Sequence, residues 1–369
     1  MSKETQSLSA IAFQKFKKNI WGVSSLGLII ILVFISIFAY VLAPDNSENA
    51  NQMHLSIHSK PPGFKVQILR IPALQMEEFK LKYYLFGFPN STSEIPINSF
   101  QINNTTIVYE EYSQEPSMRM QKSVGLESYA NYSSIEDVAK DQITTKTFWL
   151  GTDKYGRDLL SRMIIGSRVS LAIGFVAVII SLVVGIFFGS IGGYYGGKVD
   201  AVVMWIVNVI WSIPTLLLVI AITLALGKGF WQVFVAVGLT MWVEVARVVR
   251  GQVISAKEMQ YVTAARALGF GNFRIIVNHI LPNIMAPVIV ISAANFASAI
   301  LVESGLSFLG LGAQPPIPTW GSIIKDHYNY IILGKPYLAM VPGIAIMLLT
   351  LAFMVVGNAL RDALDQKSA

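Results

Sequence analysis

The sequence predicts an all-α integral membrane protein with six transmembrane helices and an inserted segment that contains β-strands. Three observations lead to this prediction: few residues are charged, six long stretches are apolar, and a polar segment of about 100 residues separates the first two stretches. Of the 369 residues, 53% are hydrophobic and 14% are charged, whereas about a quarter of the residues in a typical globular domain are charged. The chain has no cysteine, which excludes disulfides, thiolate nucleophiles and cysteine-ligated metals.

The six apolar stretches have the length that a membrane crossing requires. A helix of roughly 20 apolar residues crosses a hydrocarbon core about 30 Å thick. Only the fourth stretch contains a charged residue, Glu244, near its end, and charges within a membrane are unfavourable. The first stretch is longer than the apolar part of a signal peptide, so we interpret it as an uncleaved anchor. The stretches are Ile20–Ala43, Val169–Tyr194, Ala201–Leu226, Phe230–Ala246, Ile284–Val302 and Tyr337–Leu360.

The polar segment at residues 44–146 is too long for a simple loop, so we expect a small inserted domain. Alternating or aromatic-rich sequences predict strands in "FKVQILRI" (64–71) and "FKLKYYLFGF" (79–88). A further strand, with a turn at its Asn pair, is predicted in "NSFQINNTTIVYEEY" (98–112). The predicted organisation is an amino-terminal segment with the first anchor at 1–43, the insert at 44–146, and a five-helix core at 147–369 that includes a loop at 247–282.

The distribution of Lys and Arg predicts the orientation in the membrane. An even number of crossings places both termini on one side, and basic residues near the crossings mark the cytoplasm. The loop at 247–282 has five basic residues and a single acid, Glu258, which favours cytoplasmic termini and an extracytoplasmic segment at 44–168. Four basic residues between 154 and 168 run against the rule. The net charge of +6 forms no continuous basic stripe, so we expect lipid and no nucleic acid as a partner.

Glycines recur every fourth residue near the end of the second stretch. Such a ladder lets another helix approach closely in lipid, and a flexible face lining a pore is the alternative. The overlapping "GGYYGGKV" has the spacing of a phosphate-binding loop, but Val199 lacks the hydroxyl that would bind magnesium, so no nucleotide site is expected. The ladder consists of Gly185, Gly189, Gly193 and Gly197.

The remaining polar residues in the apolar stretches suggest no catalytic site. We find no nucleophile with a base and no metal-ligand spacing. The acids Glu244 and Glu303 are both placed near helix ends, which disfavours an ion-coupled secondary transporter, because such proteins use acids within the membrane. Asn208 and Pro214 are the candidates for a translocation path, although ordinary helix packing with a proline kink is the favoured explanation.

The loop at 247–282 contains a short amphipathic helix. Four residues at helical spacing form one apolar face of small side chains, with polar residues opposite. Such a helix is suited to docking into a groove on another protein, and lying on the membrane surface is the alternative. The apolar face comprises Tyr261, Ala264, Ala265 and Leu268, and the other side comprises Gln260, Thr263 and Arg266.

Two residues predict how this helix ends and how the next begins. Gly269 is placed to close the first helix in a left-handed cap. Asn272 is placed to cap the second helix, and Pro282 falls where that helix gives way to the fifth crossing.

Several motifs resemble those of known transport proteins. Ala264 and Ala265, then Gly269, then Leu281 and Pro282 resemble the E-A-A-x-x-x-G loop of ABC importer permeases, which contacts the ATPase subunit. Around it, "LGTDKYGRDLLSR" (150–162), "GGYYGGKVDA" (192–201), "ESGLSFLGLGAQPPIPTWG" (303–321) and "LRDALD" (360–365) resemble the C-type permease subunit of oligopeptide and dipeptide importers, a family that also includes nickel permeases.

The resemblance covers residues 147–369 and the first anchor, and it implies a fold, partners and a mechanism. The fold would be that of a type I ABC importer permease. The partners would be a second homologous permease, two ATPase subunits that carry ATP and Mg, and an extracytoplasmic solute-binding protein, so this chain would be neither an enzyme nor a cofactor protein. Thr263 stands where the family motif has Glu, and Gln260 stands where relatives often have an acid, so a salt bridge is not expected at either position. The insert lies outside the resemblance.

Overall fold

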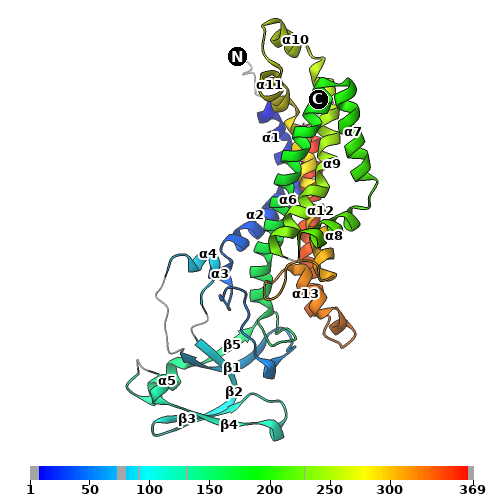
Figure 1. Cartoon of the computed structure of the whole chain (residues 1–369). Helices are drawn as coiled ribbons and strands as arrows, with labels where there is room; N and C mark the ends of the chain where they lie inside the picture. Colours follow the sequence, from blue (N-terminus) through cyan, green and yellow to red (C-terminus); the bar gives the residue numbers. More distant parts are fainter. Residues whose placement is uncertain (1–7, 73–79, 90–91, 130–131, 228, 365–369) are drawn as a thin grey trace, which may run out of the picture. The chain divides into compact units, whose positions relative to one another are not determined.

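The computed structural model describes all residues except 1–7, 73–79, 90–91, 130–131, 228 and 365–369 (Figure 1). The contacts within the chain divide it into two compact units. The helical unit comprises Met1–Val33, Ser170–Gln314 and Gly343–Ala369, and the sheet unit comprises Phe34–Val169 and Pro315–Pro342. The sheet unit is thus larger than the insert predicted at 44–146.

Among the described residues, five helical stretches are long and apolar enough to cross a membrane. They agree with five of the predicted crossings, but helix α9 (Phe230–Lys257) extends well beyond the predicted end at Ala246. Glu244 therefore lies in the middle of a helix and not near its end. The stretches are Ile20–Ile37 (α2), Leu159–Tyr195 (α6), Trp231–Lys257 in α9, Asn272–Phe308, which ends in α12 (Met285–Phe308), and Tyr337–Leu364 (α14).

The predicted third crossing is broken into two helices. Helices α7 (Gly197–Trp211) and α8 (Thr215–Leu226) meet at an angle of 91°. Pro214 precedes α8 directly, and a proline both lacks an N–H donor and disfavours helical conformation in the residue before it. The apolar stretch Ala201–Leu226 is therefore bent next to Pro214, which agrees with the proline kink considered from the sequence.

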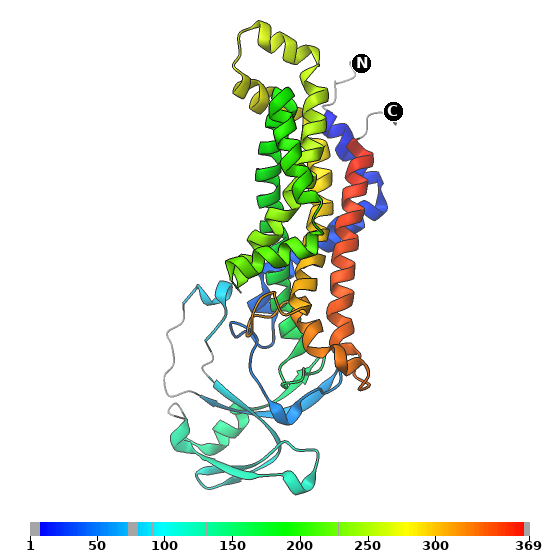
Figure 2. The ribbon, with the colours of Figure 1, turned by 45° about the vertical axis from the view of Figure 1, so that its right-hand side comes forward.

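The register of α6 against α9 shows that α7 and α8 connect two helices that run in the same direction. The two helices touch at glycines, and the contact positions rise together along both chains, so the helices run in the same direction. The chain between them must return across the full thickness of the helical unit, and only α7 and α8 are available for that return (Figure 2). The contacts that define the register are Gly238 with Ile180, Gly185 with Val245, Gly189 with Ala246, and Gly193 with Arg250.

The amino-terminal helices pack along α14, as the blue and red ribbons of Figure 2 show. Ile29 of α2 is buried with Ala352 and Val356. Phe16 of α1 (Leu8–Lys18) is buried with Ala359 and Ala363. Small alanines on α14 allow this close approach, as expected for helices that associate in lipid.

The sheet unit contains a five-stranded antiparallel sheet in the order β4-β3-β2-β1-β5. Helix α5 (Ile135–Gln142) covers one face, with Val138 and Ala139 against Leu69 and Ile97. Helix α13 (Trp320–His327) also belongs to this unit, and the Trp320 indole donates a hydrogen bond to the Met163 carbonyl at 3.0 Å. The strands are β1 (Phe64–Pro72), β2 (Thr92–Asn103), β3 (Thr106–Glu111), β4 (Gln121–Gly125) and β5 (Ile143–Phe148).

Two of the three predicted strand regions are confirmed. β1 coincides with "FKVQILRI", and β2 and β3 form a hairpin whose turn lies at the Asn pair, where Asn104 has φ +44°. The prediction for 79–88 is wrong: Tyr83–Phe86 form a single helical turn, α4, and Gly87 ends it with φ +93°. Residue 79 lies outside the described residues. The preference of aromatic residues for strands depends on their context. Here a glycine with positive φ ends the helix after one turn.

Candidate coupling site at the end of the helical unit

The predicted amphipathic helix is α10 (Gln260–Ala267), which lies at one end of the helical unit (Figure 1). Val262 and Ala265 are buried, at 0% and 3% exposure. They join a core cluster that includes Val253 of α9 and Val288 of α12, and also Ile275, which lies between these helices in the sequence. The inner side of α10 is therefore continuous with the core of two long helices.

A glycine closes α10 as the sequence predicts. Gly269 has φ +77°, in the left-handed region that favours glycine. Its N–H donates to the Arg266 carbonyl at 2.9 Å, and the N–H of Phe270 donates to the Ala265 carbonyl at 3.1 Å. These are the two bonds of a Schellman cap, which satisfies carbonyls that a helix end leaves free.

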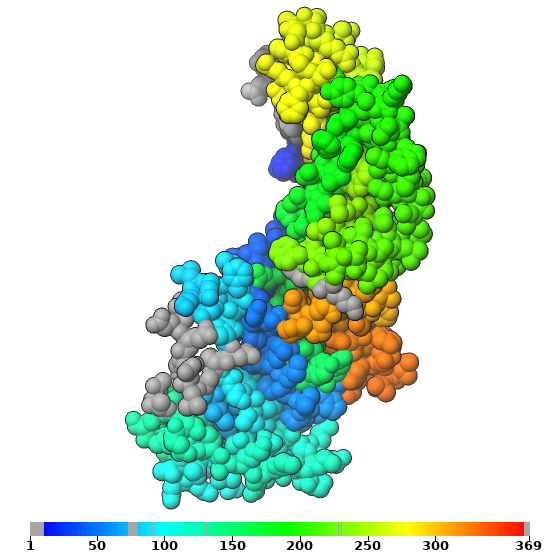
Figure 3. Space-filling view, in the orientation of Figure 1, coloured from blue at the N-terminus to red at the C-terminus, as the bar shows by residue number. Residues whose placement is uncertain are grey.

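The outer side of α10 and its neighbouring turns form an exposed apolar surface. We call it the coupling surface, and it is part of the segment coloured yellow-green to yellow at the end of the helical unit in Figure 3. Leu268 and Phe273 are 73% and 79% exposed. Exposed apolar side chains that gather at one end of a helical unit mark a site of interaction with a protein or a membrane surface. The coupling surface comprises Met259, Tyr261, Ala264, Leu268 and Phe273.

The structure corrects one member of the predicted apolar face. Tyr261, Ala264 and Leu268 are exposed, but Ala265 is buried within the chain. Val262 and Ala265 form a second apolar row of α10, and the chain's own core takes that row. Only the row with Tyr261, Ala264 and Leu268 is left exposed.

Asn272 does not cap the following helix. Helix α11 (Asn272–Ile275) has Gly271 in the capping position, without a side-chain hydrogen bond. The Asn272 side chain instead accepts a hydrogen bond from the Tyr194 hydroxyl at 2.9 Å, where Tyr194 ends α6. This contact ties the loop to α6.

Basic side chains brace the same loop through aromatic rings. The Arg266 guanidinium lies 5.5 Å from the Tyr194 ring centroid, and that of Arg274 lies 4.3 Å from Phe270. Phe270 also stacks on His279 at 5.5 Å. Such cation–π contacts hold a surface segment in place while leaving its charge exposed.

The remaining predicted residues of the loop lie in α10 and at the end of the loop. Gln260 and Thr263 are exposed, and Leu281 packs against the core cluster. Pro282 lies in a 3₁₀ turn, Leu281–Ile284, which follows a π turn at Ile276–Ile280 and precedes α12. The transition predicted at Pro282 is thus a change of helix type within a continuous stretch. A proline lacks the donor that a regular helix would need at this point.

An ion pair that the sequence did not predict joins the start of α7 to α9. Asp200, in the first turn of α7, accepts two hydrogen bonds from Arg250 of α9, at 2.5 and 2.6 Å. Two parallel bonds between a guanidinium and a carboxylate are both strong and geometrically specific. An acid in the first turn of a helix was a signal that could have drawn attention to Asp200.

Three of the four ladder glycines pack against α9. An added Cβ would lie 2.5 Å from Val245 at Gly185, 2.6 Å from the Ala246 carbonyl at Gly189, and 2.8 Å from the Arg250 carbonyl at Gly193. Gly197 is not part of this contact. It begins α7 with φ +50°, and nothing lies within 4 Å of its added Cβ.

Comparison with known proteins identifies this arrangement. Residues 181–369 match the model of the family described as "Binding-protein-dependent transport system inner membrane component". The chain belongs to that family. Residues 7–62 of this permease also match the model "N-terminal TM domain of oligopeptide transport permease C", and the sheet lies between the two matched regions.

Curated relatives of the permease carry names from peptide transport. It is 42% identical to the dipeptide transport system permease protein DppC of Alkalihalophilus pseudofirmus. The 219 aligned residues cover 59% of this chain and 72% of the relative. It is 37% identical to the oligopeptide transport system permease protein OppC of Bacillus subtilis over 64% and 77% of the two chains. Among solved structures, a chain of the inward-facing MetNI methionine ABC transporter is similar, with a TM-score of 0.46 and 20% sequence identity. The match covers 56% of this chain and 97% of the MetNI chain.

The polar residues proposed for a translocation path lie on exposed positions of the permease. Asn208 of α7 and Pro214 are both exposed. Glu244 is exposed in the middle of α9, in line with Arg247, whose guanidinium lies 4.1 Å from the Trp211 ring centroid. A charge in such a position requires protein or water beside it rather than lipid.

Proposed function

We propose that the chain is the C-type permease subunit of an ATP-driven ABC importer for peptides. The observation that carries this proposal is the exposed apolar coupling surface on a helix whose inner side is anchored in the core. The names of the relatives support peptides as the solute class. Nickel or another small solute is the alternative within the same permease pattern.

The proposed assembly contains a second homologous permease, two ATPase subunits and an extracytoplasmic solute-binding protein. ATP and Mg would bind on the ATPases. The termini and the loop at 247–282 would be cytoplasmic, supported by the basic residues of that loop, and residues 44–168 would be extracytoplasmic. Neutral Gln260 and Thr263 make this docking mainly apolar.

Movement of α10 would reach the membrane helices directly. Ala265 and Val262 share one buried cluster with Val249 of α9 and Val288 of α12. Because a packed core resists deformation, a displacement of α10 shifts both helices together. Each nucleotide state of the ATPases would favour one of two conformations of the path, inward-open or outward-open.

A charge placed on the coupling surface tests the proposal. In Leu268→Asp, the exposed position tolerates the new residue within the folded chain, but the carboxylate would have to be desolvated against an apolar groove. We expect the variant to reach the membrane while ATPase co-purification and peptide uptake fall at least about tenfold, the equivalent of roughly 1.4 kcal/mol.

Leu81→Asp is the matched control, because Leu81 is 82% exposed and lies in the sheet unit. It should leave uptake and ATPase binding unchanged. Wild-type uptake by Leu268→Asp would refute the coupling role. Peptide uptake driven by an ion gradient in vesicles without ATPases would replace the proposal with a secondary transporter.

A further inference from the structure

A lysine in the sheet unit is buried without an acidic partner. Lys60 is only 8% exposed. Its ammonium lies 5.5 Å from the Phe64 ring centroid and 5.1 Å from that of Tyr112. Among the described residues, no carboxylate pairs with it and no acceptor takes a hydrogen bond from its Nζ. Aromatic rings attract a cation, but they leave the three ammonium donors unused.

The lysine lines a cavity of about 850 Å³ within the sheet unit. Two acids also line it, but Glu111 is held by Lys122 at 2.7 Å and Glu115 is exposed, so neither neutralises Lys60. Burial lowers the pKa of Lys60, and no neighbouring acid opposes that effect. The cavity therefore contains a cation that no acidic side chain neutralises.

The motif "LGTDKYGRDLLSR" fixes the position of this lysine. The Thr152 hydroxyl accepts a hydrogen bond from the Lys60 N–H at 2.8 Å, and the Lys60 carbonyl accepts from the Thr152 N–H at 3.1 Å. Tyr337 also donates to that carbonyl, at 2.6 Å. Gly151 has φ +79°, and a Cβ there would lie 2.2 Å from the Lys60 carbonyl oxygen. Only glycine permits this clamp.

The residue before the lysine is held in an unusual conformation. Ser59 has φ +53°, which is unfavourable for a residue with a side chain. Its buried hydroxyl has no hydrogen-bond partner among the described residues, and Ser59 lines the same cavity. Backbone strain beside an unused polar group is a recognised feature of binding sites.

Part of the lining of the cavity is apolar and adaptable. Met118 and Met120 are 67% and 63% exposed. Both line the cavity together with Tyr112. Methionine side chains are flexible and polarisable, so such a wall accepts apolar groups of different shapes.

We propose that this cavity binds the free carboxylate end of a peptide, with Lys60 as the anion-binding group and the Met118 and Met120 wall against the peptide side chains. The low exposure of Lys60, 8%, favours a narrow, extended chain end over the flat surface of a folded partner. The inference rests on the proposed peptide substrate. It adds a site outside the membrane helices and assigns it a ligand class.

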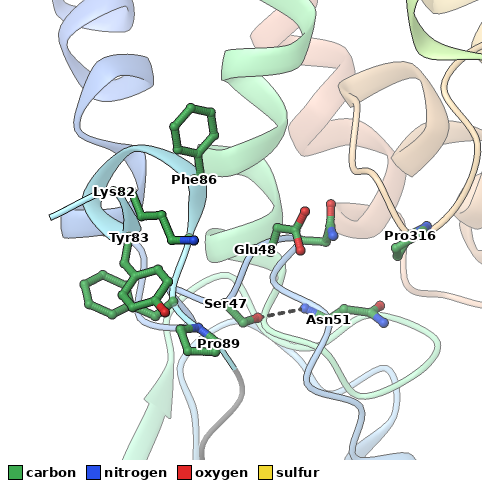
Figure 4. A pocket seen from close by; sticks show the side chains of 11 residues that line it. Ser47, Glu48, Asn51, Lys82, Tyr83, Phe86, Pro89 and Pro316 are labelled. Carbon is green, nitrogen blue, oxygen red and sulfur yellow. Dashed lines mark hydrogen bonds between the residues drawn. The ribbon is translucent and has the colours of Figure 1, made fainter. Parts of the chain in front are cut away.

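A different cavity in the sheet unit, of about 560 Å³, lacks these features (Figure 4). Its wall carries Lys82 and Glu48, which are opposite in charge, and Lys82 is exposed. It therefore contains no buried cation.

Peptide binding to the purified full chain tests the proposal. The probes are a fluorescently labelled apolar tetrapeptide with a free carboxyl terminus and the same peptide with a terminal amide. We expect the free acid to bind at least about tenfold more tightly than the amide. Lys60→Met should remove that preference, and Lys60→Arg should keep it. Lys65→Met, at an exposed position of β1, is the matched control and should also keep it.

Equal binding of acid and amide, a preference retained in Lys60→Met, or no binding of either peptide would overturn the inference. Protection of the sheet amides from hydrogen exchange shows whether each variant is folded. Peptide uptake by the assembled wild-type transporter separates the two proposals. Normal uptake without a preference for the free acid would refute only the cavity site. Absence of any peptide uptake would refute the proposed peptide substrate.

Discussion

Acidification should loosen the sheet through one buried carboxylate, Glu94 of β2. Its side chain is 6% exposed and lies 2.6 Å from Lys146 Nζ, 3.3 Å from Arg70 Nε and 3.6 Å from His54 Nε2. Burial alone would raise the pKa of Glu94, but His54, Lys146 and Arg70 outweigh it and lower the pKa from 4.5 to about 2. The charged carboxylate is thus favoured in the folded state.

The sign and size of the effect follow from this difference. A carboxyl whose pKa is lowered by folding stabilises the fold above its unfolded pKa and loses that contribution as the pH falls through the folded pKa. The difference between 4.5 and about 2, at roughly 1.36 kcal/mol for each pH unit, amounts to about 3 kcal/mol at neutral pH. About 2 kcal/mol of it should disappear between pH 6 and pH 3.

Hydrogen exchange of β1, β2 and β5 in the full chain measures this loss. After correction for the intrinsic pH dependence of exchange, the wild type should lose a factor of about 30 in protection between pH 6 and pH 3. Glu94→Gln should be less protected at pH 6 and should change less with pH. Glu115→Gln, which alters an exposed carboxyl without an ion pair, is the control. The same pH dependence in the wild type and in Glu94→Gln would refute the assignment.

Three further predictions concern the helical unit. Gly189→Ala should lower the free energy of unfolding of the purified chain by about 1–3 kcal/mol, because its Cβ would meet a backbone carbonyl. Gly251→Ala, which has open space, is the control and should raise the free energy of unfolding by roughly 0.5–1 kcal/mol. The opposite order of stability in thermal denaturation would contradict this packing. Gly269→Ala should destabilise the end of α10 by about 1 kcal/mol, seen as faster amide exchange there and nowhere in the sheet. Tyr194→Phe, which removes the hydrogen bond to Asn272, should cost about 0.5–1.5 kcal/mol, and an unchanged melting temperature would count against that bond.

The sequence predicts the features that depend on local chemistry. Long apolar runs locate the crossings, and a glycine after a helix predicts the left-handed cap at Gly269. The glycine spacing predicts close packing for Gly185, Gly189 and Gly193. These results follow from neighbouring residues and need no knowledge of the fold.

The missed features depend on contacts that are distant in the sequence. Asp200 and Arg250 are separated by a broken crossing, and nothing local pairs them. The predicted apolar face of α10 included Ala265, but packing against the core buries Ala265 together with Val262. Glu244 was assigned to a helix end because α9 continues for about three turns beyond the predicted end at Ala246, through a segment that contains charged residues. The partnerless state of Lys60 depends on surrounding side chains from several segments.

The path of the chain into and out of the sheet has a practical consequence. Phe64 at the start of β1 pairs with Phe148 at the end of β5, and the Gly63 N–H donates to the Phe148 carbonyl at 2.9 Å. The two ends of the segment at 64–148 are therefore adjacent, so the segment can be inserted or deleted without displacing the flanking residues. Replacing residues 64–148 by a two-residue turn, or by a fluorescent reporter with neighbouring termini, should leave the helical core able to assemble.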